Sequence, residues 1–120
     1  MTQPPRPGVP VRGSTGGRPV MAALDLFGRR WTLRVLWELR DGALGFRALQ
    51  ARCDGMSSSV LRQRLVELVA AGLVERSGDG YALTHLGLDA MTALRPLDRW
   101  SRRWAARWPE ATADPDPPPG

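Results

Sequence analysis

Several residue types that other functions depend on are scarce or absent in this sequence. One cysteine and one histidine in 120 residues exclude an internal disulfide framework and a cysteine-based structural zinc site. No apolar run approaches the roughly 18 residues of a membrane-spanning helix, and residues 1–6 lack the apolar segment of a secretory signal. No pair of titratable groups has catalytic spacing. We therefore expect no metal, no cofactor, no membrane insertion and no enzymatic activity.

Lysine, isoleucine and asparagine are also missing, so all 17 basic residues are arginine. The codons of these three residues are rich in A and T, and their joint absence indicates codon bias in a GC-rich genome. The use of arginine is therefore weak support for nucleic-acid binding. The net charge of +5 is more informative by position, because three arginines in residues 1–18 cancel three acidic residues in 109–120. The positive surplus therefore lies in residues 21–109.

Proline and glycine mark both ends of the chain. Residues 1–18 are rich in both and show no periodic apolar face, which predicts a disordered N-terminal arm. Residues 109–120 are rich in proline and aspartate and are predicted to be a second disordered tail. The chain length is that of one small domain, which we expect in residues 19–108.

Between these ends, apolar spacing and glycines predict mainly helices and one hairpin. Gly28, Gly42 and Gly72 each follow a helical segment, and Ser57 is a good N-cap. Pro96 must break or kink the last helix, because proline removes a backbone hydrogen bond. The predicted elements are helices at 20–27 and 31–40, an extended pair at 44–45, helices at 46–52 and 57–71, strands at 73–76 and 81–84 around a turn at 77–80, and a helix from 84 to about 108. This order indicates an α+β fold, mainly α, of the winged helix-turn-helix type, with a short β-hairpin wing.

The helix predicted at 57–71 has one polar face suited to duplex DNA. Ser59, Arg62 and Gln63 lie on this face in the first two turns, the part of a recognition helix that reaches base edges. Arginine can bind guanine through two hydrogen bonds, and glutamine can bind adenine in the same way. A merely solvated face is the less favoured alternative. The residues predicted to face the core are Leu61, Leu65, Leu68 and Gly72.

Phosphate contacts are predicted around this helix. Free backbone N–H groups at its N-terminus attract anions, which favours Ser57 and Ser58. Asp79 at the tip of the wing opposes the approach of a phosphate, so we expect little insertion of the wing into the minor groove. The full predicted DNA-binding set is Ser57, Ser58, Ser59, Arg62, Gln63, Arg47, Arg52 and Arg76.

Three other side chains near this surface are given structural interpretations. Arg64 lies toward the core flank and is predicted to pair with a carboxylate or a phosphate. Cys53 is predicted to be a buried or half-buried turn residue, with a redox role as the less favoured alternative. His85 has no partner of the metal-ligand or triad type, so we assign it no chemistry.

Three tryptophans recur every four residues in the last helix and form one apolar stripe. A winged helix of this size has too small a core to absorb three indoles as a monomer. The stripe therefore predicts a C-terminal dimerisation helix that packs against the first helix of a second copy. The alternative is an aromatic ligand pocket that also uses Trp31 and Trp37, but aromatic stripes are more often packing surfaces. The predicted interface comprises Val20, Leu24, Phe27, Leu97, Trp100, Trp104 and Trp108.

The order of these motifs resembles the HxlR-type regulators, which are winged-helix relatives of the MarR group. The resemblance covers roughly residues 19–105 and rests on the following matches: Pro19-Val20, Ala23 to Gly28, Arg30-Trp31-Thr32, Phe46, Leu49, Gly55-Met56-Ser57, Leu61, Arg64-Leu65, Glu67-Leu68, Gly72-Leu73-Val74, Tyr81, Leu83-Thr84 and Gly87. Three departures stand out. Arg18 replaces a cysteine that many members use to sense electrophiles or oxidants, the wing is shortened, and Ala48 replaces a common glutamate.

Together these observations predict a sequence-specific, double-stranded DNA-binding transcriptional regulator. The resemblance implies a homodimeric repressor that acts at a palindromic operator by steric occlusion, in the cytoplasm of a bacterium. A small-molecule effector of unknown identity fits the same interpretation. The alternative function is a protein-interaction module that docks through Trp100, Trp104 and Trp108.

Overall fold

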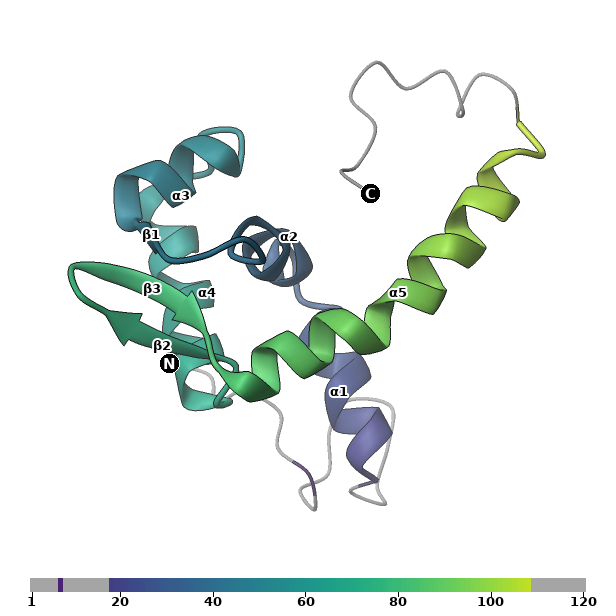
Figure 1. Ribbon diagram of the computed structural model, residues 1–120, viewed down its shortest axis with the longest axis horizontal. Coiled ribbons are helices and arrows are strands. Elements are labelled where there is room, and N and C mark those ends of the chain that lie inside the picture. Colours follow the sequence, from purple (N-terminus) through teal and green to yellow (C-terminus); the bar gives the residue numbers. More distant parts are fainter. Residues whose placement is uncertain (1–6, 8–17, 109–120) are drawn as a thin grey trace.

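The computed structural model describes Pro7 and residues 18–108 of the chain. Within these residues the fold has five helices and one small antiparallel sheet (Figure 1). The elements are α1 (Pro19–Phe27), α2 (Thr32–Glu38), β1 (Leu44–Gly45), α3 (Phe46–Arg52), α4 (Ser58–Ala70), β2 (Val74–Ser77), β3 (Gly80–Leu83) and α5 (His85–Ala105). The predicted fold class, a mainly helical winged helix-turn-helix, is confirmed. The predicted tail and nearly all of the predicted arm lie outside the described residues.

The wing is a tight hairpin. β3 is the central strand and pairs antiparallel with both β1 and β2, with Ser77 opposite Gly80 and Leu44 opposite Tyr81. Gly78 adopts φ of +59° at the first turn position, a conformation that glycine accepts without steric cost. β1 lies where it was predicted, whereas β2 and β3 are each offset by one residue from their predicted positions, and the turn between them is two residues shorter than predicted.

The core lies beneath α4 and is formed by leucines from four helices. Leu61, Leu65 and Leu68 are fully buried against Leu36 and Leu49, which confirms the predicted apolar face of α4 for these three leucines. Gly72 was predicted to belong to this face, and the structure corrects that prediction. Gly72 is exposed and has φ of +84°, so it lies beyond the helix end in the left-handed conformation that glycine favours.

Side-chain caps fix where the two longest helices begin. The Ser57 hydroxyl accepts a hydrogen bond from the Val60 N–H at 3.2 Å, as predicted. Thr84 caps α5 by accepting from the Gly87 N–H at 3.0 Å, and its hydroxyl donates to the Gly72 carbonyl at 2.6 Å. This second contact ties the start of α5 to the end of α4.

Pro96 does not break α5, which runs as one helix of 21 residues. Its axis bends partway along (Figure 1). Proline deprives the carbonyl one turn earlier of its donor, but both Pro96 and Thr92 are exposed, and a missing hydrogen bond costs less at the surface than in the core. The second half of α5 extends away from the rest of the fold.

Candidate nucleic-acid interface

The outward face of α4 is polar at its N-terminal end. Ser58, Ser59, Arg62 and Gln63 are exposed, in agreement with the predicted polar face. The Ser57 Oγ, besides capping the helix, lies 3.4 Å from the Ser59 Oγ. Further along, Val66 is also exposed, so the polar part of the face is confined to the first two turns. Arginine and glutamine, both exposed here, are residue types that hydrogen-bond base edges in the major groove.

The guanidinium of Arg62 rests on an aromatic ring. Its central carbon lies 4.9 Å from the centroid of the Phe46 ring at the start of α3. This contact joins the two helices of the helix-turn-helix on their exposed side. Sequence reasoning missed it, because helical periodicity places Arg62 on a face but does not show what it contacts on another helix.

Three further arginines flank α4. Arg47 and Arg52 are exposed on α3, and Arg76 is exposed on β2. Arg76 donates a hydrogen bond to the Tyr81 hydroxyl at 2.8 Å and lies 4.8 Å from the centroid of the same ring. With the N-terminus of α4, these residues are the predicted phosphate contacts, and all of them are open to solvent.

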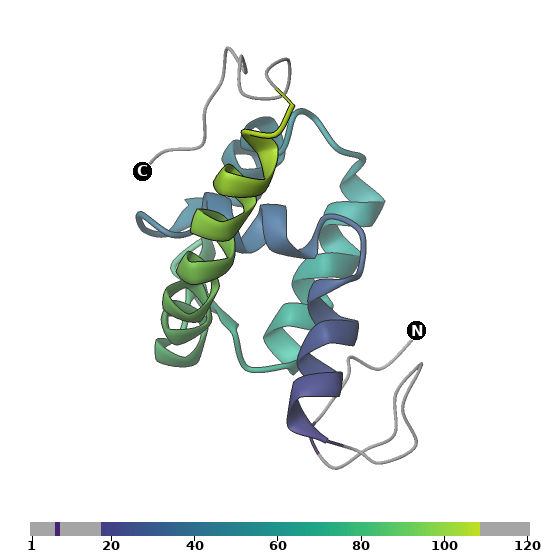
Figure 2. The same cartoon turned by 90° about the vertical axis from the view of Figure 1, so that its right-hand side faces the viewer.

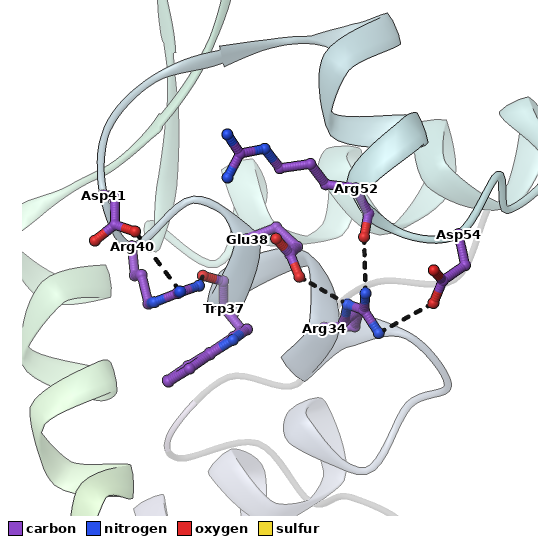
Figure 3. A network of polar contacts seen from close by, with 7 residues as sticks. All are labelled: Arg34, Trp37, Glu38, Arg40, Asp41, Arg52 and Asp54. Carbon is purple, nitrogen blue, oxygen red and sulfur yellow. Dashed lines mark hydrogen bonds and ion pairs between the residues drawn. The ribbon is translucent and has the colours of Figure 1, made fainter. Parts of the chain in front are cut away.

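Arg34 holds the turn of the motif in place (Figure 3). From α2 it donates to the Glu38 carboxylate at 2.9 Å and to the Arg52 carbonyl at 2.8 Å, and it pairs with Asp54 at 3.2 Å. Burial opposes its charge, but the Glu38 hydrogen bond and the charge of Asp54 outweigh burial and raise the pKa of Arg34. The clamp fixes the end of α3 against α2. It was not predicted from the sequence.

Cys53 lies in the turn that this clamp fixes, and it is fully buried, which confirms the prediction of a buried turn residue. Burial raises the pKa of the Cys53 thiol to about 11, although the positive charge of Arg34 opposes the rise. The thiol is therefore almost entirely protonated at neutral pH, and only the thiolate is an effective nucleophile.

A buried carboxylate anchors the other side of α4. Glu67 is 2% exposed, and it accepts hydrogen bonds from Arg29 at 3.1 Å and from Arg64 at 2.5 Å. Arg29 also lies 3.6 Å from Asp25 in α1. The predicted carboxylate partner of Arg64 is confirmed. The bridge to Arg29 was not predicted, although the spacing of Arg64 and Glu67 on one helix indicates their own pair.

A separate apolar surface lies on α5 and α1. Trp100, Trp104 and Trp108 are each about half exposed, at 49%, 52% and 47%, and Val20 and Leu24 are both 59% exposed. Neighbouring rings of the stripe contact one another, with centroids 5.7 and 5.4 Å apart. Leu97 belongs to the same exposed stripe, whereas Phe27 is half-buried and packs against the core.

The other two tryptophans do not join this stripe by any ring contact in residues 18–108. Trp31 carries the Arg30 guanidinium at 5.2 Å, and Trp37 carries that of Arg40 at 4.1 Å. Arg40 also donates to the Trp37 carbonyl and pairs with Asp41 (Figure 3). An arginine therefore occupies one face of each ring that the pocket alternative required.

Two negative findings apply to the described part of the chain. No cluster of three or more histidine, cysteine, aspartate or glutamate side chains there could hold a metal ion. None of its helices combines the length and apolar character needed to cross a bilayer.

The chain is similar in sequence and in structure to known helix-turn-helix regulators. The family model described as HxlR-like helix-turn-helix matches residues 26–109. An uncharacterised HTH-type transcriptional regulator of Mycobacterium tuberculosis is 38% identical over 98 residues, which are 76% of this chain and 61% of the relative. The quinone-bound YodB from B. subtilis is 27% identical with a TM-score of 0.68, over 70% of this chain and 96% of YodB. A possible HxlR family transcriptional factor from Thermoplasma volcanium is 34% identical with a TM-score of 0.59, over 65% of this chain and 76% of that one. The chain therefore belongs to the HxlR-like helix-turn-helix family and is a DNA-binding transcriptional regulator, not an enzyme.

Proposed function

We propose that this regulator is a homodimeric repressor that binds a roughly palindromic operator and occludes a promoter. The observation that carries the proposal is the exposed polar start of α4, with Arg62 and Gln63 side by side in sequence and facing solvent. In a symmetric dimer, two such helices enter successive major grooves, about 10 bp apart. The positive charge of the chain adds affinity by releasing counterions from the DNA.

The contacts divide into base reading and phosphate binding. Arg62 is suited to guanine and Gln63 to adenine, and Ser59 lies beside them on the same face. The remaining contacts are to phosphates, which set register but carry no sequence information. The two-residue wing turn carries Asp79, which keeps the wing tip out of the minor groove. The phosphate-binding set is Ser57, Ser58, Arg47, Arg52 and Arg76.

Dimerisation uses the exposed apolar surfaces of α5 and α1. Figure 2 shows α1 and the second half of α5 well apart in one protomer, so neither covers the other. A second copy supplies both missing partners at once, because the stripe of Trp100, Trp104 and Trp108 packs on the partner's Val20 and Leu24. Such an isologous arrangement gives the two-fold symmetry that a palindromic site requires.

We further propose a small-molecule effector and a cytoplasmic location in a bacterium. The similar YodB structure has a quinone bound, which supports a small-molecule effector for this chain. Arg18 stands where many relatives of this family carry a sensing cysteine, and Cys53 is buried and protonated. Burial and the raised pKa argue against Cys53 as the sensing group, so we assign regulation to a ligand and not to this thiol.

Selection from random-sequence duplexes with the purified chain tests the proposal. We expect enrichment of a palindrome. Affinity should also fall as salt is raised from 50 to 200 mM. For each phosphate contacted, a tenfold rise in salt should lower the affinity by roughly ten-fold. Binding without salt dependence, or no enrichment, contradicts DNA recognition and favours the protein-interaction alternative.

Arg62→Ala then tests the assignment of base reading. We expect loss of discrimination at one base pair per half-site, by about 1–3 kcal/mol. The matched control is Arg47→Ala, which removes a predicted phosphate contact and weakens binding to all sequences about equally. An Arg62→Ala variant that behaves like the control shows that Arg62 contacts a phosphate.

A further inference from the structure

The contact between α3 and α4 carries a further inference, which rests on the proposed function. Phe46 is the first residue of α3, and its ring lies beneath the exposed guanidinium of Arg62 at 4.9 Å. We propose that Phe46 is a positioning residue for base recognition. It holds the guanidinium of Arg62 in one orientation before DNA binds.

The geometry of a guanidinium makes this arrangement effective. The group is planar, its N–H donors point outward in the plane, and its faces stack on aromatic rings. The Phe46 ring takes one face and offers no acceptor to compete for the donors. Among residues 18–108, no hydrogen bond or ion pair uses the Arg62 N–H groups. The edge that binds guanine is therefore available while the side chain is held.

The Phe46 ring is itself fixed relative to α4. Phe46 is half-buried and packs against the core cluster. On the same helix, the Gln50 amide donates to the Met56 carbonyl at 2.8 Å, just before α4 begins. Arg34 holds the Arg52 carbonyl at the other end of α3. The ring that supports Arg62 therefore moves with the recognition helix.

The wing arginine provides an informative contrast. Arg76 stacks on Tyr81 at 4.8 Å, but it also donates to the hydroxyl of that residue. One donor is thus already used, which suits a residue that contacts a phosphate as a charge. Phe46 lies at a similar distance from the Arg62 guanidinium, 4.9 Å, and has no hydroxyl to occupy a donor. The Phe46 ring therefore suits an arginine that reads a base, and the Tyr81 ring suits an arginine that contacts a phosphate.

The contribution of Phe46 is measured as the affinity of each variant for the duplexes that the selection enriches. Phe46→Leu keeps an apolar side chain but removes the aromatic face. A cation–π contact at an exposed site corresponds to roughly a two- to five-fold change in affinity, and two half-sites multiply it to about four- to twenty-five-fold. We expect this loss on the best duplex and a smaller loss on a duplex altered at the base pair that Arg62 reads. Phe46→Tyr keeps the aromatic face and is expected to lose less affinity than Phe46→Leu, but its hydroxyl adds an acceptor that competes for an Arg62 donor, as that of Tyr81 does for Arg76.

Coupling between the two residues separates positioning from mere packing. In an Arg62→Ala background, we expect Phe46→Leu to cause no further loss of affinity or discrimination. Ala48→Gly is the matched control, because it weakens the same helix on an exposed position away from Arg62. It is expected to leave base preference unchanged. Thermal unfolding of each variant checks that it is folded, and Phe46→Met replaces Phe46→Leu if that variant is not.

Several results overturn the inference. Equal losses from Phe46→Leu on all duplexes, or losses that add to those of Arg62→Ala, show that Phe46 only supports the fold. An original chain that selects a palindrome, together with a Phe46→Leu variant of identical preference and affinity, removes this inference and leaves the proposed function intact. An original chain that selects no sequence removes both.

Discussion

The recognition helix α4 and the second half of α5 are both amphipathic, but only α4 has its apolar side buried within the protomer. The apolar side of α4 is fully buried, and its polar side faces solvent. On α5, Trp100 and Trp104 face solvent although they are among the largest apolar side chains of the chain. A single protomer therefore buries the apolar side of α4 but leaves the tryptophans of α5 exposed.

The ion pairs of the two helices also differ in burial. In α4, the Glu67 carboxylate is buried between Arg29 and Arg64. In α5, Asp98 pairs with Arg102 at 3.2 Å on the open surface. Removal of water strengthens charge pairing and raises the cost of losing a partner. The orientation of α4 is therefore set within one chain, whereas the position of α5 depends on what covers it.

The largest effect is expected from Glu67→Ala. It leaves two mostly buried arginines without their shared carboxylate, and breaking a buried pair in this way costs about 4 kcal/mol of unfolding free energy. Urea denaturation measures the loss. Since small domains have only about 5–15 kcal/mol of stability, the folded fraction of the variant falls visibly on mild heating.

Glu75→Ala is the control, because Glu75 is an exposed glutamate on β2. Its expected cost is below about 0.5 kcal/mol. A Glu67→Ala loss of the same size contradicts the internal anchoring of α4. Glu67→Gln retains hydrogen bonding without the charge and is expected to fall between the two.

Trp104→Glu tests the other side of the comparison. A carboxylate in the middle of the proposed interface should weaken dimerisation by about 3 kcal/mol, roughly 150-fold, while the protomer keeps its fold. Light scattering is expected to show monomers where the original chain is dimeric. Arg95→Glu introduces the same group on the opposite, exposed face of α5 and is expected to leave the dimer intact. A dimer that survives Trp104→Glu contradicts the assigned interface.

What could be predicted from the sequence depends on whether a feature lies within one element or between elements. Features of one helix or one turn were predictable: the Ser57 cap, the buried leucines of α4 and the exposed tryptophan stripe all follow from periodicity and local propensity. Contacts between positions far apart in the chain were not. Arg29 with Glu67, Arg34 with the Arg52 carbonyl, and Arg62 with Phe46 each require knowledge of how helices cross.

The predictions for Gly72 and Pro96 had different outcomes, and each outcome has a local cause. Gly72 falls on the buried side of a helical wheel, but the wheel assumes that the helix continues to that residue. Pro96 was expected to break α5 or kink it, and α5 bends without a break (Figure 1). The helix continues because the affected turn lies at the exposed surface, where the missing hydrogen bond costs less.

Cys53 reports whether the turn before α4 stays closed. Its pKa of about 11, against an ordinary 9.0, reduces the thiolate fraction at pH 7 about 100-fold. We expect alkylation by a small reagent to be slower by at least this factor than in the urea-unfolded chain. Because the folded pKa is the higher one, the stability gained from the neutral thiol is complete below pH 9 and is lost as pH rises through 11. Alkylation at the unfolded rate near pH 7 contradicts a closed turn.

The smallest effect is expected from Asp98→Ala in α5. Asp98 and Arg102 are 43% and 47% exposed, and an exposed pair four residues apart on a helix contributes only about 0.3–0.5 kcal/mol. This corresponds to a fall in Tm of roughly 1–4 °C for a domain of this size, and 1 M salt should abolish the difference between variant and original because it screens exposed charges. A loss as large as that of Glu67→Ala, seen only at protein concentrations that favour dimers, shows instead that the second copy buries this pair. The interface would then extend beyond the tryptophan stripe. The two helices would differ in how far their side chains are buried only in the isolated protomer, and not in the dimer.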